Sequence, residues 1–505
     1  MRALFANPEL RRNWRAQLRP GRMIAAVIIA AVLSLALGFA LSESVPAPVW
    51  GQTLLYLALL GQLLALTVGG SLSCLHAIQR EKEMNTFDFQ RVTRLTPSEL
   101  TLGKLFGAPA LGYFITLCLL PAAIVGAVVG DVRPAFFLAA YAVLLLGSIT
   151  FHAFALMVSM HLERGSTAAA VLLILLVLWI LSIPGGFGGV LALGELGPFF
   201  APDLLSQTSW ALSDHVMSGG GYNPFVIDLF FDQPVHHFFV LVVLYLTLTA
   251  WFLLAVTRNI KRDPTVYEVY TPAQSLGFIL YLNFLLLAFF RWHPGRPFDD
   301  QGILTGLNLG LFFLLGLVLL RNRDRLRRRL RERQAGAANG FDVLWPAPYL
   351  LLGAVVVGAA IIGMVEWKRS PEQAWNLGLA IFRLAFFTAW LVRDVQYLQW
   401  MNLRTTRRPL VKGVLFLTVF YVVMVIVLAS MDFFEQPERL PYTALFVPSG
   451  AFVDPLSWAA HPALWSVALA LQVVAAGFFV YLQKRKLRGL SSPARNAPTL
   501  AARGL

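Results

Sequence analysis

The chain is 505 residues long, 57% of its residues are hydrophobic, only 13% are charged, and its formal net charge is +14. A soluble globular protein carries about 25% charged residues, so this composition excludes an ordinary soluble domain. The apolar residues form long blocks, and a helix of about 20 apolar residues crosses a bilayer while satisfying its own backbone. Because no nucleic-acid-binding motif accompanies the basic residues, they indicate membrane orientation rather than a nucleic-acid partner.

Cysteine usage and the N-terminal region narrow the class further. Cys74 and Cys118 lie in or beside apolar blocks and form no CxxC pair, so neither a disulfide framework nor a metal site is expected. Six arginines precede the first apolar block, and no small-residue cleavage site follows it. We therefore expect this block to remain in the chain as a membrane span.

Residues 7–19 predict a basic amphipathic helix lying on the membrane surface. Asn7 suits the N-cap and Pro8 the first helical position. Three apolar residues recur every four positions among arginines: Leu10, Trp14 and Leu18. This pattern is typical of an interfacial helix, and an unstructured basic leader is the alternative.

The apolar blocks predict an all-α, polytopic bundle of about 12 transmembrane helices. The expected spans are 23–41, 51–74, 105–129, 134–160, 166–183, 235–256, 273–292, 302–320, 346–367, 375–391, 411–430 and 464–482. With the N-terminus in the cytoplasm, about 34 of the 41 Lys and Arg residues fall in cytoplasmic segments and about six in outer ones. This bias predicts that both termini are cytoplasmic.

Four parts are expected along the chain. They are an interfacial helix (1–22); a transmembrane domain (23–260) with a cytoplasmic loop at 78–104 and an outer loop at 184–234; two further spans with an arginine-rich cytoplasmic connector (261–344); and a last transmembrane part (345–505), for which a degenerate repeat of the first domain is one of two readings. Eight arginines between Arg321 and Arg333 suit a connector that touches solvent and anionic lipid. The outer loop 184–234 is rich in Gly, Pro and Phe and suits re-entrant pieces, with disorder as the alternative.

The segment 80–107, between the second and third spans, is dense in charge yet carries several apolar residues. Those residues are Met84, Phe87, Phe89, Val92 and Leu95. Pro97 breaks the helix, and Thr96 with Glu99 predicts a capping box that starts the next one. The residues alone leave two readings open: a docking surface for a soluble partner, or a helix lying on lipid headgroups.

Two sets of glycines four residues apart predict close helix packing. Gly103 and Gly107 stand at the entry to the third span, and Gly302, Gly306 and Gly310 follow one face of the eighth. Small residues at this spacing let a second helix approach closely. A hinge is the alternative for the second set.

The first half of the chain also carries a family pattern. The residues concerned are Glu81, Glu83, Thr86, Asp88, Leu95, Thr96, Pro97, Glu99, Leu100, Gly103, Lys104 and Leu105. Their order resembles the permease subunits of ABC-2 type transporters, in which an acidic loop precedes Leu-Thr-Pro, a Glu-Leu pair and a Gly-Lys-Leu entering the third span. The resemblance covers about residues 1–160, including the interfacial helix.

The resemblance implies that this loop couples the chain to a separate ATP-hydrolysing subunit. The implied contact residues are Glu81, Glu83, Thr86, Phe87, Asp88 and Arg91. It also implies two copies of that ATPase, which would bind ATP and Mg²⁺, and either a second permease chain or a fused pair of halves. The chain has no GxxxxGK[ST] loop, so no cofactor and no catalytic residue is expected in it. The family further implies export of a substrate from the inner membrane of a bacterium.

The second half departs from the pattern. Arg393-Asp394 after the tenth span and the run from Arg404 to Gly413 faintly repeat the coupling segment with a shorter loop. A degenerate internal duplication would explain this. However, the seventh and eighth spans lack counterparts, so the duplication is one of two open readings.

The polar residues inside the spans, and the motifs that the chain lacks, bear on three other functions: an ion-coupled carrier, an enzyme and an anchor subunit. The expected spans contain no Asp or Glu except Glu366 at an edge, which argues against an ion-coupled carrier. No HExxH or GxSxG motif supports an enzyme. A non-transporting anchor or assembly subunit stays open, and the aromatic, acid-free spans suit a lipidic or amphipathic cargo.

Arg383 and His152 are the notable polar residues within spans. Arg383 is expected to face the bundle interior, where it either meets an anionic substrate group or pairs with backbone carbonyls. His152 is expected either to pack with a hydrogen bond or to line a substrate path.

Overall fold

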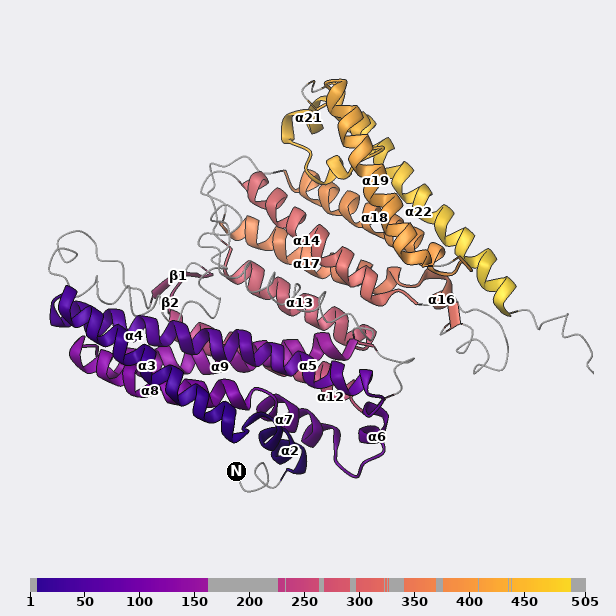
Figure 1. The fold of residues 1–505 in the computed structure, drawn as a ribbon. Helices are drawn as coiled ribbons and strands as arrows, with labels where there is room; N and C mark the ends of the chain where they lie inside the picture. The colour runs from indigo at the N-terminus through magenta and orange to yellow at the C-terminus, as the bar shows by residue number, and fades with distance from the viewer. Residues whose placement is uncertain are drawn as a thin grey trace, which may run out of the picture. The chain divides into compact units, whose positions relative to one another are not determined.

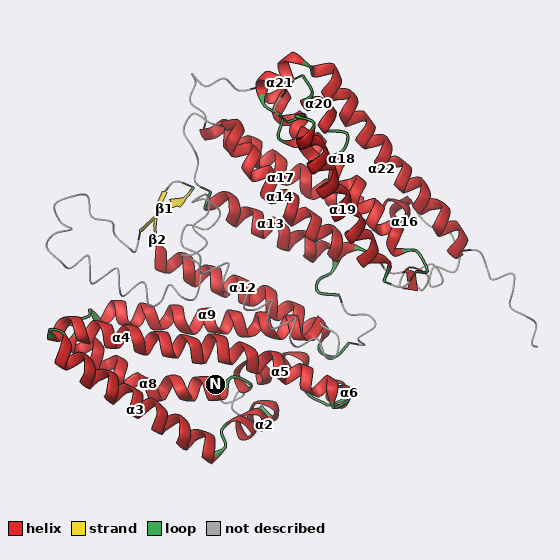
Figure 2. Cartoon of the chain, turned by 45° about the horizontal axis from the view of Figure 1, so that its top comes forward, coloured by secondary structure: helices red, strands yellow, loops and turns green. Residues whose placement is uncertain are grey.

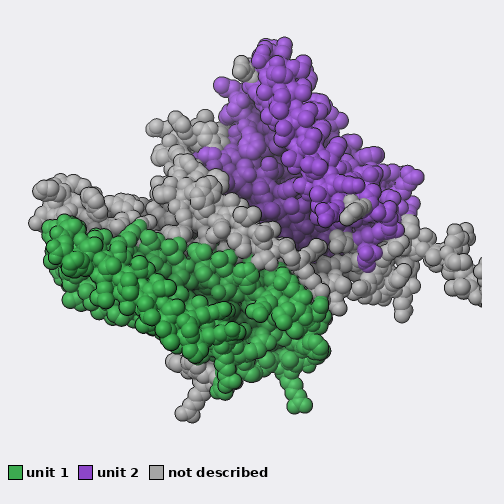
Figure 3. Space-filling model, in the orientation of Figure 1, with its two compact units in different colours: residues 1–269, 288–291 green, residues 270–287, 292–505 purple. Residues whose placement is uncertain are grey.

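The structure is a computed structural model of the chain. It describes residues 7–161, 226–231, 233–262, 268–290, 297–321, 323–324, 326, 340–368, 376–406, 408–434, 436 and 438–491. Contacts divide the chain into two compact units, Met1–Val269 with Ala288–Arg291 and Tyr270–Leu287 with Trp292–Leu505 (Figure 3). The first unit ends close to the boundary expected at residue 260. The second contains nearly all of the two parts expected at 261–344 and 345–505.

Helices dominate both units, which confirms the predicted all-α class (Figure 2). Among the described residues one pair of strands interrupts this pattern, β1 (Val226–Phe230) and β2 (Gln233–His236). The strands are antiparallel, with Val226 opposite His236 and Phe230 opposite Gln233.

The first unit is an array of long helices with three short ones at one end (Figure 1). In chain order its helices are α2 (Pro8–Gln17), α3 (Pro20–Ser44), α4 (Ala47–Leu63), the π-helical turn η1 (Leu64–Gly69), α5 (Gly70–Glu83), α6 (Phe87–Arg91), α7 (Pro97–Gly107), α8 (Ala110–Val129), α9 (Pro134–His161) and α12 (His237–Asn259).

The second unit is a bundle built largely around one long central helix, α18. Its elements are α13 (Pro272–Ala288), α14 (Pro297–Leu319), α16 (Gly340–Leu344), α17 (Ala347–Lys368), α18 (Leu377–Asn402), α19 (Pro409–Ser430), α20 (Leu440–Thr443), the 3₁₀ turn η4 (Pro448–Ala451), α21 (Pro455–Ala460) and α22 (Pro462–Ser491). Helix α18 packs against α14, α17, α19 and α22.

Nine helices of the described residues are long and apolar enough to cross a membrane, so the chain is a multi-pass membrane protein. They account for nine of the expected spans. Of the other three, 166–183 lies outside the described residues, and 273–292 is the shorter apolar helix α13, of 17 residues. The span expected at 375–391 is part of α18, whose 26 residues include Arg383, Arg393 and Asp394.

The second span is longer than a bilayer requires. Helix α4, the π turn and α5 run continuously from Ala47 to Glu83, which is 37 residues. At 1.5 Å per residue this is about 55 Å, whereas the hydrocarbon core of a bilayer is about 30 Å thick. The charged end of α5 therefore projects well beyond the apolar layer.

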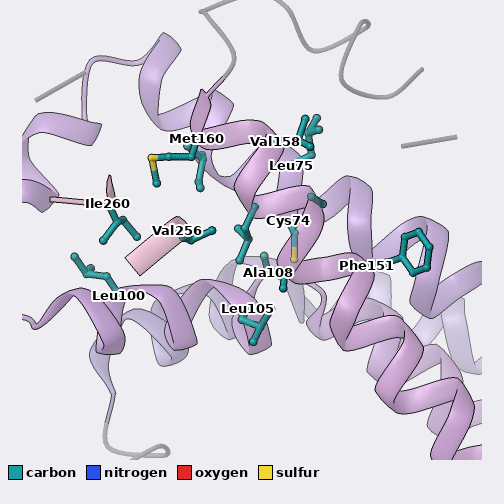
Figure 4. Close-up of a cluster of buried hydrophobic side chains, with 14 of the residues drawn as sticks. Cys74, Leu75, Leu100, Leu105, Ala108, Phe151, Val158, Met160, Val256 and Ile260 are labelled. Carbon is teal, nitrogen blue, oxygen red and sulfur yellow. The ribbon is translucent and has the colours of Figure 1, made fainter. Parts of the chain in front are cut away.

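At the end of the first unit that carries α6 and α7, side chains of five helices form one buried apolar cluster. Cys74 and Leu75 of α5, Leu100 and Leu105 of α7, and Val256 of α12 belong to it, together with side chains of α9 (Figure 4). Because these apolar side chains are buried away from water, the cluster stabilises the packing of α6 and α7 against the ends of the longer helices.

The predicted close packing at Gly103 and Gly107 is confirmed. A Cβ atom at Gly103 would lie 2.7 Å from Cβ of Glu9, and one at Gly107 would lie 2.8 Å from Cβ of Asn13. Both neighbours belong to α2. Because Gly103 and Gly107 have no side chains, α2 can pack closely against α7. The cap of α2 forms as predicted, because the Asn7 side chain accepts from the backbone N–H of Glu9.

The second set of glycines makes no such close approach to the residues that the structure describes. Among these residues, a Cβ at Gly302 or Gly306 would meet only the Phe452 ring, at ordinary contact distance, and one at Gly310 would meet nothing within 4 Å. These glycines lie away from the face of α14 that packs on α17 and α18. The close approach occurs instead at Gly316, where a Cβ would lie 2.5 Å from Val395.

We predict that Gly103→Ala destabilises the first unit by about 1–3 kcal/mol, because the added methyl group overlaps Glu9. Gly38→Ala in α3 is the matched control, since a Cβ there meets nothing within 4 Å. Alanine favours an exposed helix by up to about 1 kcal/mol over glycine, so the control should hold or raise the melting temperature. Thermal unfolding of both variants measures the difference; equal melting temperatures would contradict the docking of α2 on α7.

Candidate functional site

The candidate site is the end of the first unit formed by α2, the end of α5, α6 and α7 (Figure 1). It contains the loop that sequence analysis singled out, residues 80–107. Helix α2 packs along α7, and Lys261 at the end of α12 donates to the carbonyl of Thr93 at 2.8 Å. The loop is therefore held both by α2 and by Lys261.

Helix α5 ends in a hydrogen-bonded cap that turns the chain toward α6. Asn85 has φ of 56°, a left-handed conformation that asparagine tolerates better than most residues. The N–H of Thr86 donates to the carbonyl of Glu81 and the N–H of Asn85 to that of Lys82, which is the Schellman arrangement. Thr86, an expected contact residue, is exposed and has its backbone N–H engaged in this turn.

Helix α7 starts with the predicted capping box. The Glu99 N–H donates to the Thr96 hydroxyl, and the Thr96 N–H donates to the Glu99 carboxylate at 2.7 Å. Hydrogen bonds from the backbone and the hydroxyl of Thr96 lower the pKa of Glu99. Because this folded-state pKa is depressed, the cap is present at neutral pH and is lost as the pH falls through it.

An ion-pair cluster joins α2, α5 and α7, and all its members except Arg12 are largely buried. The ammonium of Lys104, 1% exposed, lies 2.6 Å from Oε2 of Glu81 and 3.1 Å from Oε1 of Glu9. Arg12 lies 2.5 Å from Oε1 of Glu81 and 2.8 Å from Glu9. Gln90 of α6 also donates to Glu81, at 2.6 Å. We call Glu9, Arg12, Glu81 and Lys104 the base cluster.

The base cluster changes the role expected of Glu81. Its side chain is only 12% exposed and binds three side chains of its own chain. The expectation that Glu81 touches a partner directly is therefore corrected: it positions α2, α6 and α7 around the end of α5. Sequence spacing did not reveal this, because Glu9 and Lys104 are 95 residues apart.

The expectation for Phe87 is corrected in the same way. Phe87 is 4% exposed and belongs to the apolar cluster at the base of the unit. Phe89 is 72% exposed, because two residues along a helix turn the side chain about 200°. The outward aromatic residue of α6 is Phe89.

The exposed part of the loop carries three apolar side chains, and acidic residues stand next to them in the sequence. Met84, Phe89 and Val92 are 60, 72 and 82% exposed. Glu83 and Asp88, both expected contact residues, are exposed beside them in the sequence. We call Met84, Phe89 and Val92 the loop patch. Arg91 is the last residue of α6, and its side chain lies outside what the structure describes.

His152 is fully buried and bonds to the π-helical turn of the second span. Its Nε2 lies 2.8 Å from the carbonyl oxygen of Leu66, which accepts from the ring. A Cβ at Gly70 would lie 2.2 Å from Nε2, so this glycine makes the contact sterically accessible. The hydrogen-bonded packing role that sequence analysis offered for His152 agrees with this geometry.

Arg383, in the second unit, is 3% exposed and binds backbone. Its Nε and Nη2 donate to the carbonyl of Val453 at 2.8 and 2.6 Å, and Nη1 reaches Gln301 at 3.4 Å. Of the two expected roles, pairing with a carbonyl is the one the geometry contains.

Arg393 and Asp394 do not form a loop after the tenth span, and that expectation is wrong. Helix α18 continues to Asn402, and both residues lie inside it. Arg393 donates to Asp394 at 2.8 Å and to Gln472 of α22 at 2.6 Å, and it stacks 3.7 Å from the Trp390 ring centre. Tyr421 donates to the other oxygen of Asp394.

This network lies deep in the bundle. Tyr421 stands 12 residues into the 22-residue span α19, about 18 Å from its start. Asp394 is 5% exposed. The premise that the spans contain no interior acid therefore fails, because the helix runs past the end at which the tenth span was drawn.

Comparisons with known proteins return no relatives. No protein-family model matches the chain, and neither the search of curated proteins nor that of solved structures finds a match. Within the described residues, no group of three His, Cys, Asp or Glu side chains is arranged to hold a metal ion. The site is therefore interpreted from its own contacts.

We predict that Lys104→Met destabilises the first unit by about 3 kcal/mol, because Glu9 and Glu81 lose the ammonium between them. Arg94→Met at an exposed position of the same loop is the control and should change stability by less than about 0.5 kcal/mol. Adding Glu9→Gln and Glu81→Gln to Lys104→Met should recover part of the loss. Thermal or denaturant unfolding measures all three, and a Lys104→Met variant as stable as the Arg94→Met control would refute the role of the cluster.

Proposed function

We propose that this chain is the membrane subunit of an ATP-driven exporter of the ABC-2 type. A separate ATPase, present in two copies, would bind ATP and Mg²⁺ and dock on the loop patch. The observation that carries the proposal is an exposed apolar patch on a segment braced by buried ion pairs, at the projecting end of a membrane helix.

The arrangement suits the transfer of force. A patch on a loose loop would move without moving the spans, whereas the base cluster links this loop to α2, α5 and α7. Gln79 and Lys82 of α5 also donate to the carbonyl of Ser159 in α9. A push on the loop patch would therefore displace at least two spans. ATP would shift the populations of inward and outward states through contacts that differ between them.

An amphipathic or lipidic cargo and the inner membrane of a bacterium are parts of the same proposal. The apolar, aromatic-rich spans support such a cargo, and the charge bias supports a cytoplasmic loop patch. A second permease chain would complete the exporter if one chain does not supply both halves. A non-transporting assembly subunit would use the same patch, and transport measurements separate it from the exporter.

We predict that Met84→Ser, Phe89→Ser and Val92→Ser together weaken binding of the ATPase subunit by roughly 2 kcal/mol, about 30-fold, because exposed apolar anchors carry most of such binding. The melting temperature should not change. Leu456→Ser in α21, where Leu456 is 84% exposed, is the control and should retain binding. The measurement is titration of the purified chain with an ABC ATPase that copurifies with it, followed by ATP hydrolysis and transport in proteoliposomes.

The outcomes separate the readings of the patch. Undiminished ATPase binding and stimulation in the triple variant would exclude the loop patch as the docking site. Loss of binding to empty anionic vesicles, with ATPase stimulation intact, would favour the lipid-surface reading instead.

A second candidate function is ion-coupled transport, favoured by the buried Arg393–Asp394 pair in α18. Ionisable residues deep in a membrane often mark ion or proton paths. For this candidate, a pH gradient should drive transport in proteoliposomes without ATP, and Asp394→Asn should abolish it. The exporter predicts instead that transport needs ATP and its partner. Glu366→Gln at the end of α17 is the control variant.

A further inference from the structure

One face of α14 is polar although the helix lies within the second unit. Gln301, Thr305 and Asn308 are spaced four and three residues apart, so they share one stripe of the helix. They are 2, 8 and 2% exposed. The stripe is about 10 Å long and ends near the middle of the 23-residue helix.

Most polar atoms of this stripe are paired inside the unit. Gln301 donates to the carbonyl of Ala380 at 3.2 Å, and the Thr305 hydroxyl donates to that of Gln301 at 2.7 Å. Asn308 donates through Nδ2 to the carbonyl of Leu304 at 2.9 Å. This bond also fixes which amide atom of Asn308 is nitrogen, because the carbonyl oxygen of Leu304 can accept a hydrogen bond only from Nδ2 and not from Oδ1.

Oδ1 of Asn308 is left without a protein partner among the described residues. A buried acceptor without a hydrogen bond costs about 1–3 kcal/mol. The penalty is greater in hydrocarbon surroundings, where water does not compensate it freely. A bound molecule that donates a hydrogen bond to Oδ1 of Asn308 would remove this penalty.

A small cavity lies at this position. The three polar residues line it together with Phe312 of α14 and with apolar residues of α17 and α18, including Leu384 and Phe387. Its volume is about 20 Å³. One water needs about 10–15 Å³ on the same measure, so the cavity admits a single water.

We propose that one structural water occupies this cavity. It donates one hydrogen to Oδ1 of Asn308 and the other to the hydroxyl oxygen of Thr305, whose own hydrogen is already given to Gln301. A hard divalent cation is a poor alternative, because it takes six or more oxygen ligands. The water makes the polar stripe of α14 compatible with the apolar side chains of α17 and α18.

The test is a cryo-EM reconstruction of the full chain in nanodiscs, at a resolution that shows other internal waters. The proposal expects a density peak about 2.7–3.2 Å from Oδ1 of Asn308. The peak should disappear in the variant Thr305→Val with Asn308→Leu. A wild-type map that shows other internal waters but no peak here overturns the proposal.

Thermal unfolding gives an independent readout with a matched control. Thr305→Val should lower the melting temperature about 2–4 °C more than Thr388→Val, because it deprives the water of one acceptor. Thr388 donates to a carbonyl four residues back, as Thr305 does, but does not line the cavity. Equal shifts for the two, together with a higher melting temperature for Asn308→Leu, would mean that the cavity is dry.

Discussion

The first unit depends on one buried cation, the ammonium of Lys104 between Glu9 and Glu81. These residues come from three helices that sequence alone does not bring together. A buried charge is tolerated only when it is paired and hydrogen-bonded, so each partner restricts the positions of the others. The result ties the surface helix α2 to the projecting end of α5 and the start of α7.

The base cluster is the reason for interpreting the loop patch as a docking surface. Isolated apolar side chains on a surface are common and need no explanation. Met84, Phe89 and Val92 differ because they lie close in sequence on a segment held by a buried cluster and two backbone caps. A docking surface needs both an exposed apolar anchor and a rigid base to transmit the load.

The second unit handles polar groups differently. It keeps them inside the helical bundle, where Arg383 binds a carbonyl and Arg393 closes on Asp394. Such groups are costly in hydrocarbon, and both arginines are paired with oxygen atoms inside the unit. The first part of the loop expected in this half, through Asn402, belongs to helix α18.

Local signals in the sequence determined nine of the spans, the cap of α2, the capping box at Thr96 and the close packing at Gly103 and Gly107, because each depends on neighbours within a few residues or on hydropathy over one helix. Only the tertiary structure decided that Phe87 is buried and Phe89 exposed. It also decided that Glu81 forms an ion pair with Lys104 and that α18 continues through Asp394. Helical periodicity places residues on opposite faces without saying which face is covered. Which face is covered depends on contacts between segments that are far apart in the chain. The local sequence does not show which of these segments meet in the folded protein.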